Sequence, residues 1–297
     1  MIERPILSID WDVRTLRMVH AFVRKSSVRI DQVLSVAIPD DVDVNDAQSL
    51  GTLIRSALHK AGIGTKRALV DIPRHQANLY PLKLPRAGLE DLVQMVALQI
   101  PKELPFAVDQ AAIDFAAPPE TGAESCDVLV AAVLKDTLAF YRRVFEHAGL
   151  KLERVGLRPH ASHVAVNALL EATPHRHVLF VDVGPTATEI DVLRDKRLVF
   201  SRAANVDVPA ESDSVSLHVK PRKETETPES DEADDTAALK LNLSGGGSDS
   251  LGTDAVMAEL LIEITRSIEA YRVTEAGAEM DHAVVGGSCD IEELLAD

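Results

Sequence analysis

The 297-residue sequence has few cysteines, few aromatic residues and no long hydrophobic run. Its two cysteines, Cys126 and Cys289, are far apart and form no Cys-x-x-Cys pair, so the sequence predicts neither a disulfide framework nor a zinc site. We expect both thiols to stay reduced, as in a cytosolic protein. No apolar run approaches the roughly 18 residues of a membrane-spanning helix, and no signal peptide precedes the first apolar strand. We therefore expect a cytoplasmic protein that does not insert into a membrane.

Positive charge is also scarce. The formal net charge is −16 at pH 7 and the isoelectric point is about 5.0. Non-specific binding to nucleic acid or to an anionic membrane needs clustered Lys and Arg, so the composition argues against both partners. The sequence also contains no Gly-x-Ser-x-Gly motif, which argues against a hydrolase of that class.

One pattern occurs twice: an apolar run that ends in an aspartate, then a short turn, then a second alternating run. The first copy is residues 6–12 (ILSIDWD) and the second is residues 178–184 (VLFVDVG), 172 residues later. Such a pattern is typical of two strands joined by a turn. An aspartate at a strand tip, beside free backbone N–H groups, can hold phosphates and a hydrated Mg²⁺. Two facing hairpins therefore predict a nucleotide clamp centred on Asp10 and Asp182, and the long spacing favours duplication of a domain over solenoid repeats.

Helices and strands alternate along both halves, which predicts a mixed α/β fold of about two lobes. Apolar residues at helical spacing mark the helices, and short apolar runs bounded by turn residues mark the strands. Pro101 is expected to end the second helix, and Asp254 to cap the last long one. The predicted helices are 50–61, 89–100, 137–148, 254–276 and 291–295, and the further strands are 67–72, 127–134 and 282–285.

Residues 207–252 break this alternation. They hold 11 acidic and 4 basic residues and include the run Ser244-Gly245-Gly246-Gly247-Ser248. Their few apolar side chains do not offset the cost of ordering the backbone, about 1 to 2 kcal/mol per residue. The sequence therefore predicts a disordered acidic loop inserted into the second lobe. Its glycines precede no Gly-Lys-Ser/Thr, so a linker is favoured over a phosphate-binding loop.

Several short motifs occur in a characteristic order. They are Leu104-Pro105-Phe106 with Asp114-Phe115, 127–132 (DVLVAA), 148–155 (AGLKLERV), 182–188 (DVGPTAT), Ile264-Thr265-Arg266-Ser267 with Tyr271, and 284–288 (VVGGS). In these motifs the chain resembles the PilM family of type IV pilus assembly proteins, relatives of the cell-division actin homologue FtsA. The resemblance spans nearly the whole chain outside the acidic segment. It implies an actin-like ATPase fold: a duplicated, ribonuclease H-like core of two lobes with an inserted small subdomain. The expected ranges are 1–84 and 156–177 for the first lobe, 85–155 for the subdomain and 178–297 for the second lobe.

The resemblance also implies ligands and partners. ATP and Mg²⁺ would bind between the lobes, with Asp10 and Asp182 holding the metal shell. A pocket between the first lobe and the subdomain would receive the short cytoplasmic N-terminal peptide of a PilN-like inner-membrane protein. Pilus motor ATPase and platform proteins would be further partners of this scaffold, which would work in the cytoplasm beneath the inner membrane. The other implied ATP ligands are Gly184, Thr186 and Thr188 for the phosphates, and Gly286, Gly287 and Ser288 for the adenosine.

The first hairpin turn departs from the family pattern. It contains Asp12, Val13 and Arg14 where the family typically has glycine and small hydroxyl residues. A carboxylate about 4 Å from a phosphate oxygen costs on the order of 4 kcal/mol at an effective dielectric near 20. Arg14 would offset part of this cost by pairing with phosphate. We therefore expect ATP as a structural or regulatory ligand, with weak or no ATPase activity.

Other interpretations stay open from the residues alone. Aspartates after buried strands also cap turns, so Asp10 and Asp182 have a purely structural alternative. An FtsA-like division protein would carry an amphipathic membrane helix, and a type II secretion platform component would carry a membrane span. A small-molecule kinase of the same superfamily would need a catalytic base and an intact first phosphate turn, which Asp12 disfavours.

Overall fold

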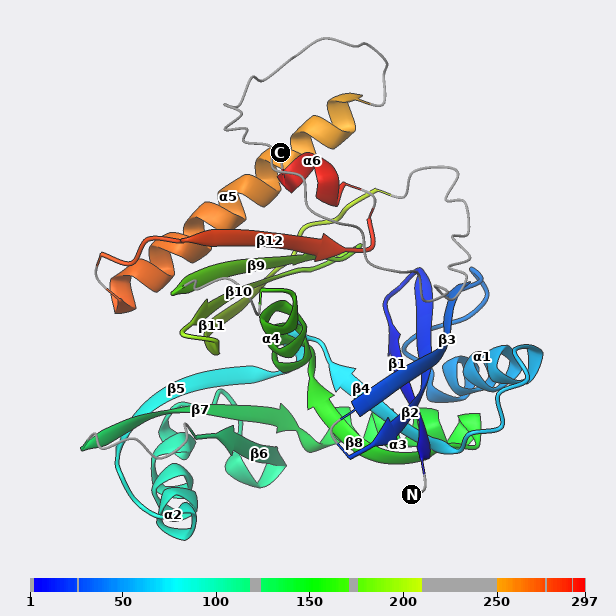
Figure 1. Cartoon of the computed structure of the whole chain (residues 1–297), viewed down its shortest axis with the longest axis horizontal. Helices are drawn as coiled ribbons and strands as arrows, with labels where there is room; N and C mark the ends of the chain where they lie inside the picture. Colours follow the sequence, from blue (N-terminus) through cyan, green and yellow to red (C-terminus); the bar gives the residue numbers. More distant parts are fainter. Residues whose placement is uncertain are drawn as a thin grey trace, which may run out of the picture.

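The computed structural model describes residues 3–25, 27–117, 124–170, 176–209, 250–275, 277–289 and 291–296. These residues form three sheets: a five-stranded sheet in a first lobe, a four-stranded sheet in a second lobe, and a three-stranded sheet beside them (Figure 1). The mixed α/β class predicted from the alternation of elements is confirmed.

The first lobe is built on the sheet β3-β2-β1-β4-β8. Leu7 and Ile9 of β1 point to one face, where Leu50 and Ile54 of the helix α1 cover them. Asp46 begins that helix, because its carboxylate accepts a hydrogen bond from Ser49 N at 2.7 Å. The elements of this lobe are β1 (Arg4–Trp11), β2 (Thr15–Arg24), β3 (Ser27–Ala37), α1 (Ala47–Lys60), β4 (Arg67–Ile72), η1 (Arg74–Gln76), α3 (Lys135–Ala148) and β8 (Lys151–Leu157).

The second lobe repeats the central part of this topology. In the first lobe β1 pairs antiparallel with β2 and parallel with β4, and in the second lobe β9 pairs antiparallel with β10 and parallel with β12. The helix α4 packs through Val166 on one face of the second sheet, while the long helix α5 packs through Leu260 on the other. The two predicted hairpins are therefore equivalent elements of a duplicated core. The elements are α4 (Arg158–Leu169), β9 (His177–Val183), β10 (Thr188–Arg194), β11 (Arg197–Ala204), α5 (Ser250–Thr274), β12 (His282–Gly287) and α6 (Glu292–Ala296).

The small sheet has the order β5-β7-β6 and is covered on one face by a single helix, α2. Pro101 acts as predicted, since α2 ends at Gln99 and the proline lies in the 3-10 turn that follows. The elements are β5 (Asn78–Pro85), α2 (Leu89–Gln99), η2 (Ile100–Lys102), η3 (Val108–Gln110), β6 (Ala111–Ala116) and β7 (Ser125–Leu134).

The extent of this small sheet differs from the predicted subdomain range of 85–155. The sheet begins at Asn78, and its last strand ends at Leu134. After that residue α3 packs against α1, and β8 pairs in parallel with β4, so both belong to the first lobe. Sequence could not show this, because an apolar helix and strand fit either sheet until their packing partners are known.

Two predictions about the acidic segment and the helix after it need correction. Val208, inside the predicted loop 207–252, is 2% exposed in the core of the second lobe, and its N–H donates to Pro185 O at 3.0 Å. At the other end, α5 begins at Ser250, so Asp254 lies within the helix and does not cap it. The apolar spacing fixes the buried face of a helix better than its first turn. Residues 210–249, the bulk of the predicted disordered loop, lie outside the described residues.

None of the helices that the structure describes has both the length and the apolar character needed to cross a bilayer.

Candidate functional site

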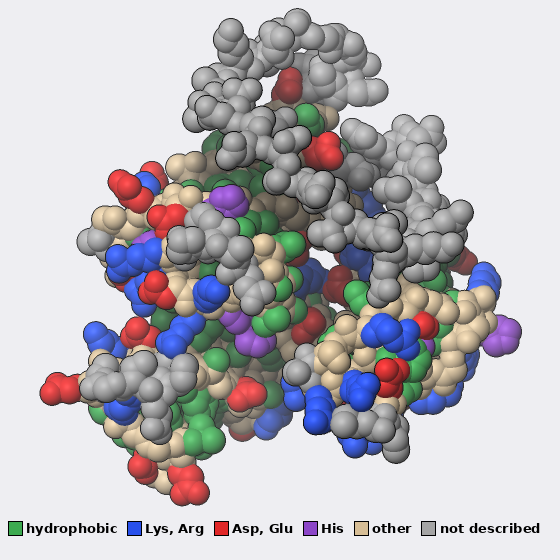
Figure 2. Space-filling view, in the orientation of Figure 1, with side chains coloured by type: hydrophobic (Ala, Val, Ile, Leu, Met, Phe, Trp, Pro, Cys, Tyr) green, Lys and Arg blue, Asp and Glu red, His purple; other side chains and the backbone are tan. Residues whose placement is uncertain are grey.

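A cleft of about 440 Å³ lies between the two lobes. The two hairpin turns, the start of α4, η1 and the loop after β12 line it, and Figure 2 shows the hollow between the lobes with charged side chains inside. Asp10 and Asp182 both line it, so the tips of the duplicated strands share one cavity. Of the nine residues predicted to bind ATP or Mg²⁺, six line this cleft: Asp10, Asp182, Gly184, Thr186, Gly287 and Ser288.

In the first hairpin turn the carboxylate of Asp12 folds back onto its own backbone. Its Oδ1 atom accepts hydrogen bonds from Arg14 N and Thr15 N, both at 2.7 Å. Its Oδ2 atom accepts from the Arg17 guanidinium and, at 3.4 Å, from the hydroxyl of Ser288 in the second lobe. The backbone N–H groups that a phosphate would need in this turn are therefore already bound to a carboxylate.

Asp10, the predicted metal ligand of the first lobe, is held by two arginines. Its Oδ2 atom lies 3.2 Å from Arg17 Nη1, and its Oδ1 atom lies 2.7 Å from Arg158 Nη2. Two guanidinium groups beside one carboxylate leave it little attraction for a divalent cation. Sequence analysis missed Arg17, although the hairpin register places it directly opposite Asp10 on β2.

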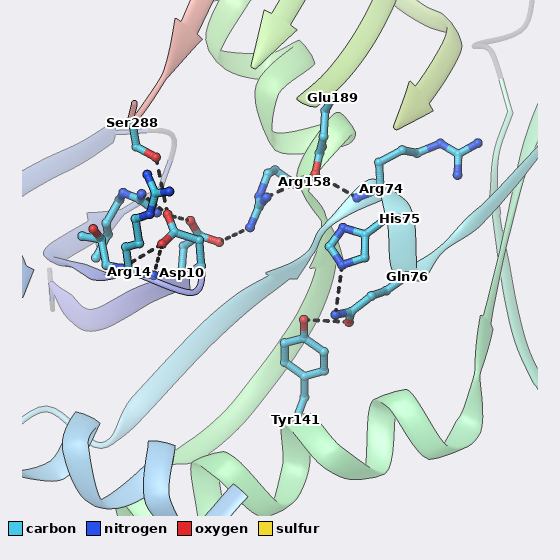
Figure 3. Close-up of polar contacts among 12 residues, drawn as sticks. Asp10, Arg14, Arg74, His75, Gln76, Tyr141, Arg158, Glu189 and Ser288 are labelled. Carbon is cyan, nitrogen blue, oxygen red and sulfur yellow. Dashed lines mark hydrogen bonds and ion pairs between the residues drawn. The ribbon is translucent and has the colours of Figure 1, made fainter. Parts of the chain in front are cut away.

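Arg158 connects the lobes at the base of the cleft (Figure 3). Besides Asp10 it binds Glu189 Oε1 at 3.2 Å, and the same oxygen accepts a hydrogen bond from Arg74 N at 2.9 Å. Burial raises the pKa of Glu189 to about 7, against the opposing effect of Arg158. Burial alone would lower the pKa of Arg158, but the carboxylates of Asp10 and Glu189 raise it above its usual value. Arg158 is therefore a permanent cation shared by both lobes.

The second hairpin turn is closed by backbone atoms. Gly184 N donates to Ala187 O at 3.2 Å, and a Cβ atom on residue 184 would lie only 2.6 Å from that oxygen, so the turn requires glycine. Asp182 lines the cleft, and no described residue donates a hydrogen bond to its carboxylate. Burial raises its pKa, with Arg158 opposing. This half of the cleft keeps room for a ligand.

Three predicted ligand residues do not line the cleft. The Arg14 guanidinium turns to the second lobe and donates to the backbone oxygen of Val208. Thr188 is fully buried, with its hydroxyl unpartnered among the described residues. Gly286, on β12, lies against the ring of Phe180. The periodicity of the sequence could place these residues near the end of a strand. It could not show whether their side chains reach the cavity.

The glycine after Gly286 has a structural explanation. Gly287 has φ +153°, and a Cβ atom there would come within 2.3 Å of Val183 O. The close approach of β12 to β9 therefore requires glycine with or without a ligand. Ser288 N also donates to Val183 O, at 3.1 Å.

The residues of the cleft fit a metal-bridged triphosphate on one side only. On the second-lobe side the Asp182 carboxylate and the Gly184 turn face open space, as ATP would need. On the first-lobe side Asp12 fills the N–H groups of the turn, and arginines take the place of a cation beside Asp10. The described residues also contain no group of three or more His, Cys, Asp or Glu side chains placed to hold a metal ion. The first-lobe half does not fit ATP with Mg²⁺.

A second and larger cavity, of about 720 Å³, lies between the small sheet and the first lobe. We call it the groove. Residues 112–116 of β6 line one side and residues 152–157 of β8 line the other. Consecutive residues of both strands take part, as expected where strand edges rather than strand faces border a cavity. In the described part of the chain β6 and β8 are each the last strand of their sheet. The floor is the face of the small sheet opposite α2 and includes Leu79, Leu129 and Ala131.

The first turn of α4 lies between the two cavities. Arg158 and Ala161 line the cleft, whereas Pro159 and His160 line the groove. One helical turn thus forms part of the wall of both.

Comparison with known proteins decides the family. The family model described as "Type IV pilus assembly protein PilM" matches residues 8–207, about two thirds of the chain. The chain belongs to the PilM family. This confirms the relationship inferred from the short motifs, and the match ends at residue 207, where the predicted acidic segment begins.

The chain is also similar to solved structures. A "PilM-PilN type IV pilus biogenesis complex" superposes with a TM-score of 0.74 at 17% identity, covering 98% of this chain and 83% of that chain. The cytoplasmic domain of EpsL, an inner-membrane component of the type II secretion system of Vibrio cholerae, gives a TM-score of 0.44 at 13% identity over 68% of this chain and 72% of that one. A protein of unknown function from Bacteroides thetaiotaomicron with an actin-like ATPase fold gives 0.39 at 9% identity over 68% and 70%. The similarity to the chain of the PilM–PilN complex, with its high TM-score, confirms the predicted fold.

Proposed function

We propose that this PilM-family protein is a scaffold of type IV pilus biogenesis that binds the N-terminal peptide of a PilN-like inner-membrane protein in the groove. The observation that carries the proposal is the position of the groove, at the junction of the small sheet and the first lobe, where the family resemblance implied a peptide site. The similarity in fold to a chain from a PilM–PilN complex supports it. Attachment through such a partner would hold the protein at the inner membrane.

The geometry of the groove favours an extended peptide. Edge strands present backbone N–H and C=O groups that can pair with an added strand, and the groove has such an edge on both sides. The apolar floor would take alternate side chains of the peptide. Arg142 and Arg154 line the cavity without an ion-pair partner among the described residues, so they are available to acidic groups of the peptide, whereas Glu153 is paired with Arg67 at 2.6 Å.

The test is calorimetric titration of the full chain with a synthetic N-terminal peptide of the PilN-like protein from the same organism. We expect Ala131→Glu, which puts a charge on the floor of the groove, to weaken binding by more than tenfold. Leu98→Glu is the matched control, because Leu98 is 75% exposed on α2, the helix that covers the opposite face of the same sheet. We expect this control to bind like the wild type.

Backbone pairing is tested with two further peptides, each N-methylated at alternate residues in one of the two registers. If the peptide adds as a strand to one of the two edges, one register abolishes binding and the other leaves it intact, since only alternate N–H groups point at a given edge. If it pairs with both edges, each register abolishes binding, and full binding of both methylated peptides would contradict backbone pairing. Absence of binding by the unmodified peptide, with and without MgATP, would contradict the proposal.

Within this proposal ATP and Mg²⁺ remain structural or regulatory ligands of the cleft rather than substrates. Asp182, Gly184 and Thr186 are the residues on the open side that could hold phosphate or metal, and Gly287 and Ser288 are placed for the nucleoside. Motor ATPase and platform proteins of the pilus are proposed as further partners. Peptide binding is expected to be the same with and without MgATP, because the groove and the cleft are separate cavities.

A further inference from the structure

We infer that the first-lobe half of the cleft carries a built-in substitute for a nucleotide: the Asp12 carboxylate occupies the anion position of its turn, and Arg17 and Arg158 occupy the cation position beside Asp10. This internal ligand holds the lobes together without ATP and competes with it. The inference concerns the cleft alone and is independent of what binds in the groove.

The first support is the complete use of the Asp12 carboxylate. Oδ1 binds two backbone N–H groups, and Oδ2 binds Arg17 and faces Ser288. A phosphate oxygen bound to this turn would need those N–H groups. The side chain of Asp12 is 13% exposed, so water competes little for it.

The second support is the replacement of metal by guanidinium. A bound Mg²⁺ would need the oxygens of Asp10, which instead lie 3.2 Å from Arg17 and 2.7 Å from Arg158. Arg17 contacts both Asp10 and Asp12, and thus neutralises two carboxylates that would otherwise repel each other. The charges of the site are balanced by the chain itself.

The third support is that the same side chains join the lobes. Arg14, in the first turn, donates to the Val208 backbone oxygen of the second lobe, and Ser288 of the second lobe faces Asp12. Arg158 binds Asp10 in one lobe and Glu189 in the other. These contacts join the lobes where a clamp would close on a ligand.

An attached group has a large advantage over one that diffuses, because its encounter costs little translational entropy. ATP entering the cleft must displace the Asp12 carboxylate from two N–H groups and from Arg17. Each charge-assisted hydrogen bond corresponds to on the order of tenfold to a hundredfold in affinity. Removing the carboxylate would free the N–H groups and leave Arg17 available to phosphate.

The experiment is calorimetric titration of the full chain with ATP, with and without Mg²⁺. We expect Asp12→Gly to bind ATP at least tenfold more tightly than the wild type, and Asp12→Asn, which keeps the shape and loses the charge, to fall between them. Asp41→Gly is the control for losing one negative charge, since Asp41 is an exposed turn residue away from the cleft. It should match the wild type.

Hydrogen exchange gives a readout that does not depend on affinity. In the wild type the amides of Arg14 and Thr15 should exchange slowly without ATP, and adding MgATP should change them little. In Asp12→Gly they should exchange fast without ATP and slowly with it, and Asp12→Ala, which also removes the accepting oxygen, serves if the glycine variant does not fold.

An ATP affinity that is the same in the wild type and both Asp12 variants would overturn the inference, and so would fast exchange of these amides in the wild type. The same samples are titrated with the PilN-like peptide. If the peptide does not bind but the ATP results are as expected, the proposal for the groove is contradicted and the internal ligand is not. If the peptide binds but the ATP results are not as expected, the internal ligand is contradicted and the groove is not.

Discussion

The two hairpins at the centre of the molecule have the same topology, but they differ in the charges of the residues paired at the strand tips. Asp10 at the tip of β1 lies across from Arg17, so the first hairpin pairs a carboxylate with a guanidinium. Asp182, its equivalent on β9, lies across from Glu189, so the second hairpin places two carboxylates opposite each other. Topology was kept in the duplication, while the charges that decide what binds there differ.

The missing cation of the second hairpin comes from elsewhere in the chain. Arg158, at the start of α4, reaches Glu189 and also Asp10. The first hairpin therefore has two arginines and the second shares one. This difference teaches that the cleft is held together from the first-lobe side and stays open on the second-lobe side.

The largest effect is expected from removing the shared arginine. Arg158→Ala leaves Glu189, which is 2% exposed, without its guanidinium partner. Stranding a buried carboxylate in this way should lower the free energy of unfolding by about 3 to 5 kcal/mol. Urea denaturation near neutral pH measures it.

The matched comparison is Arg17→Ala in the first hairpin. Arg17 is 31% exposed, and both of its partners keep other donors: Asp10 keeps Arg158, and Asp12 keeps two backbone N–H groups. Its loss should therefore cost about 1 kcal/mol or less. Equal destabilisation by both variants would remove the distinction between the hairpins.

An effect between those of Arg158→Ala and Arg17→Ala is expected from the turn of the second hairpin. In Gly184→Ala the new methyl group would lie 2.6 Å from Ala187 O, a backbone atom that cannot turn away. The free energy of unfolding should fall by about 1 to 3 kcal/mol. Gly64→Ala is the control, since nothing lies within 4 Å of a Cβ atom there, and thermal denaturation of the two variants side by side checks the difference. If Gly184→Ala left the free energy of unfolding unchanged, the backbone of this turn would be able to move away from the new methyl group, and glycine would not be required there.

A separate effect concerns pH and the buried acids of β10. Burial raises the pKa values of Glu189 and Asp191 to about 7, from 4.5 and 3.8. The folded protein therefore binds more protons than the unfolded chain between about pH 4 and pH 7, and these groups contribute stability that is lost as the pH rises through that interval. Asp191→Asn should raise the melting temperature at about pH 8 and reduce the difference between about pH 5 and pH 8.

The control for this pH effect is Asp41→Asn, which changes an exposed carboxylate. It should leave the difference between the two pH values as in the wild type. A pH dependence that is unchanged by Asp191→Asn would show that this acid is already neutralised in another way.

Much of the fold and part of the site could be predicted from sequence because they depend on local pattern. The two apolar runs that end in Asp10 and Asp182 predicted equivalent strands facing one cavity, and the structure places them so. The sequence also shows that the first hairpin turn departs from the family pattern at Asp12. Its consequence was expected to be repulsion of phosphate, whereas the structure shows a carboxylate bound to its own turn, a conformation that aspartate favours at turns.

The rest depends on long-range packing. Arg158 was missed because its partners lie 148 and 31 residues away in sequence, and only the folded lobes bring them together. Arg17 could have been found from the register of the hairpin, once the turn length was fixed. The assignment of α3 and β8 to the first lobe likewise needed knowledge of which sheet edge was free.

The turn of α4 that carries Arg158 and Ala161 toward one cavity and Pro159 and His160 toward the other is a partition one helix thick. Successive side chains on a helix are rotated by about 100°, so neighbouring residues of this turn face different cavities. A substitution at residue 159 that reshapes the wall of the groove is expected to shift the backbone that positions the guanidinium of residue 158. A substitution in this turn of α4 therefore affects the walls of both cavities, and the residues tolerated there are limited by the cleft and by the groove together.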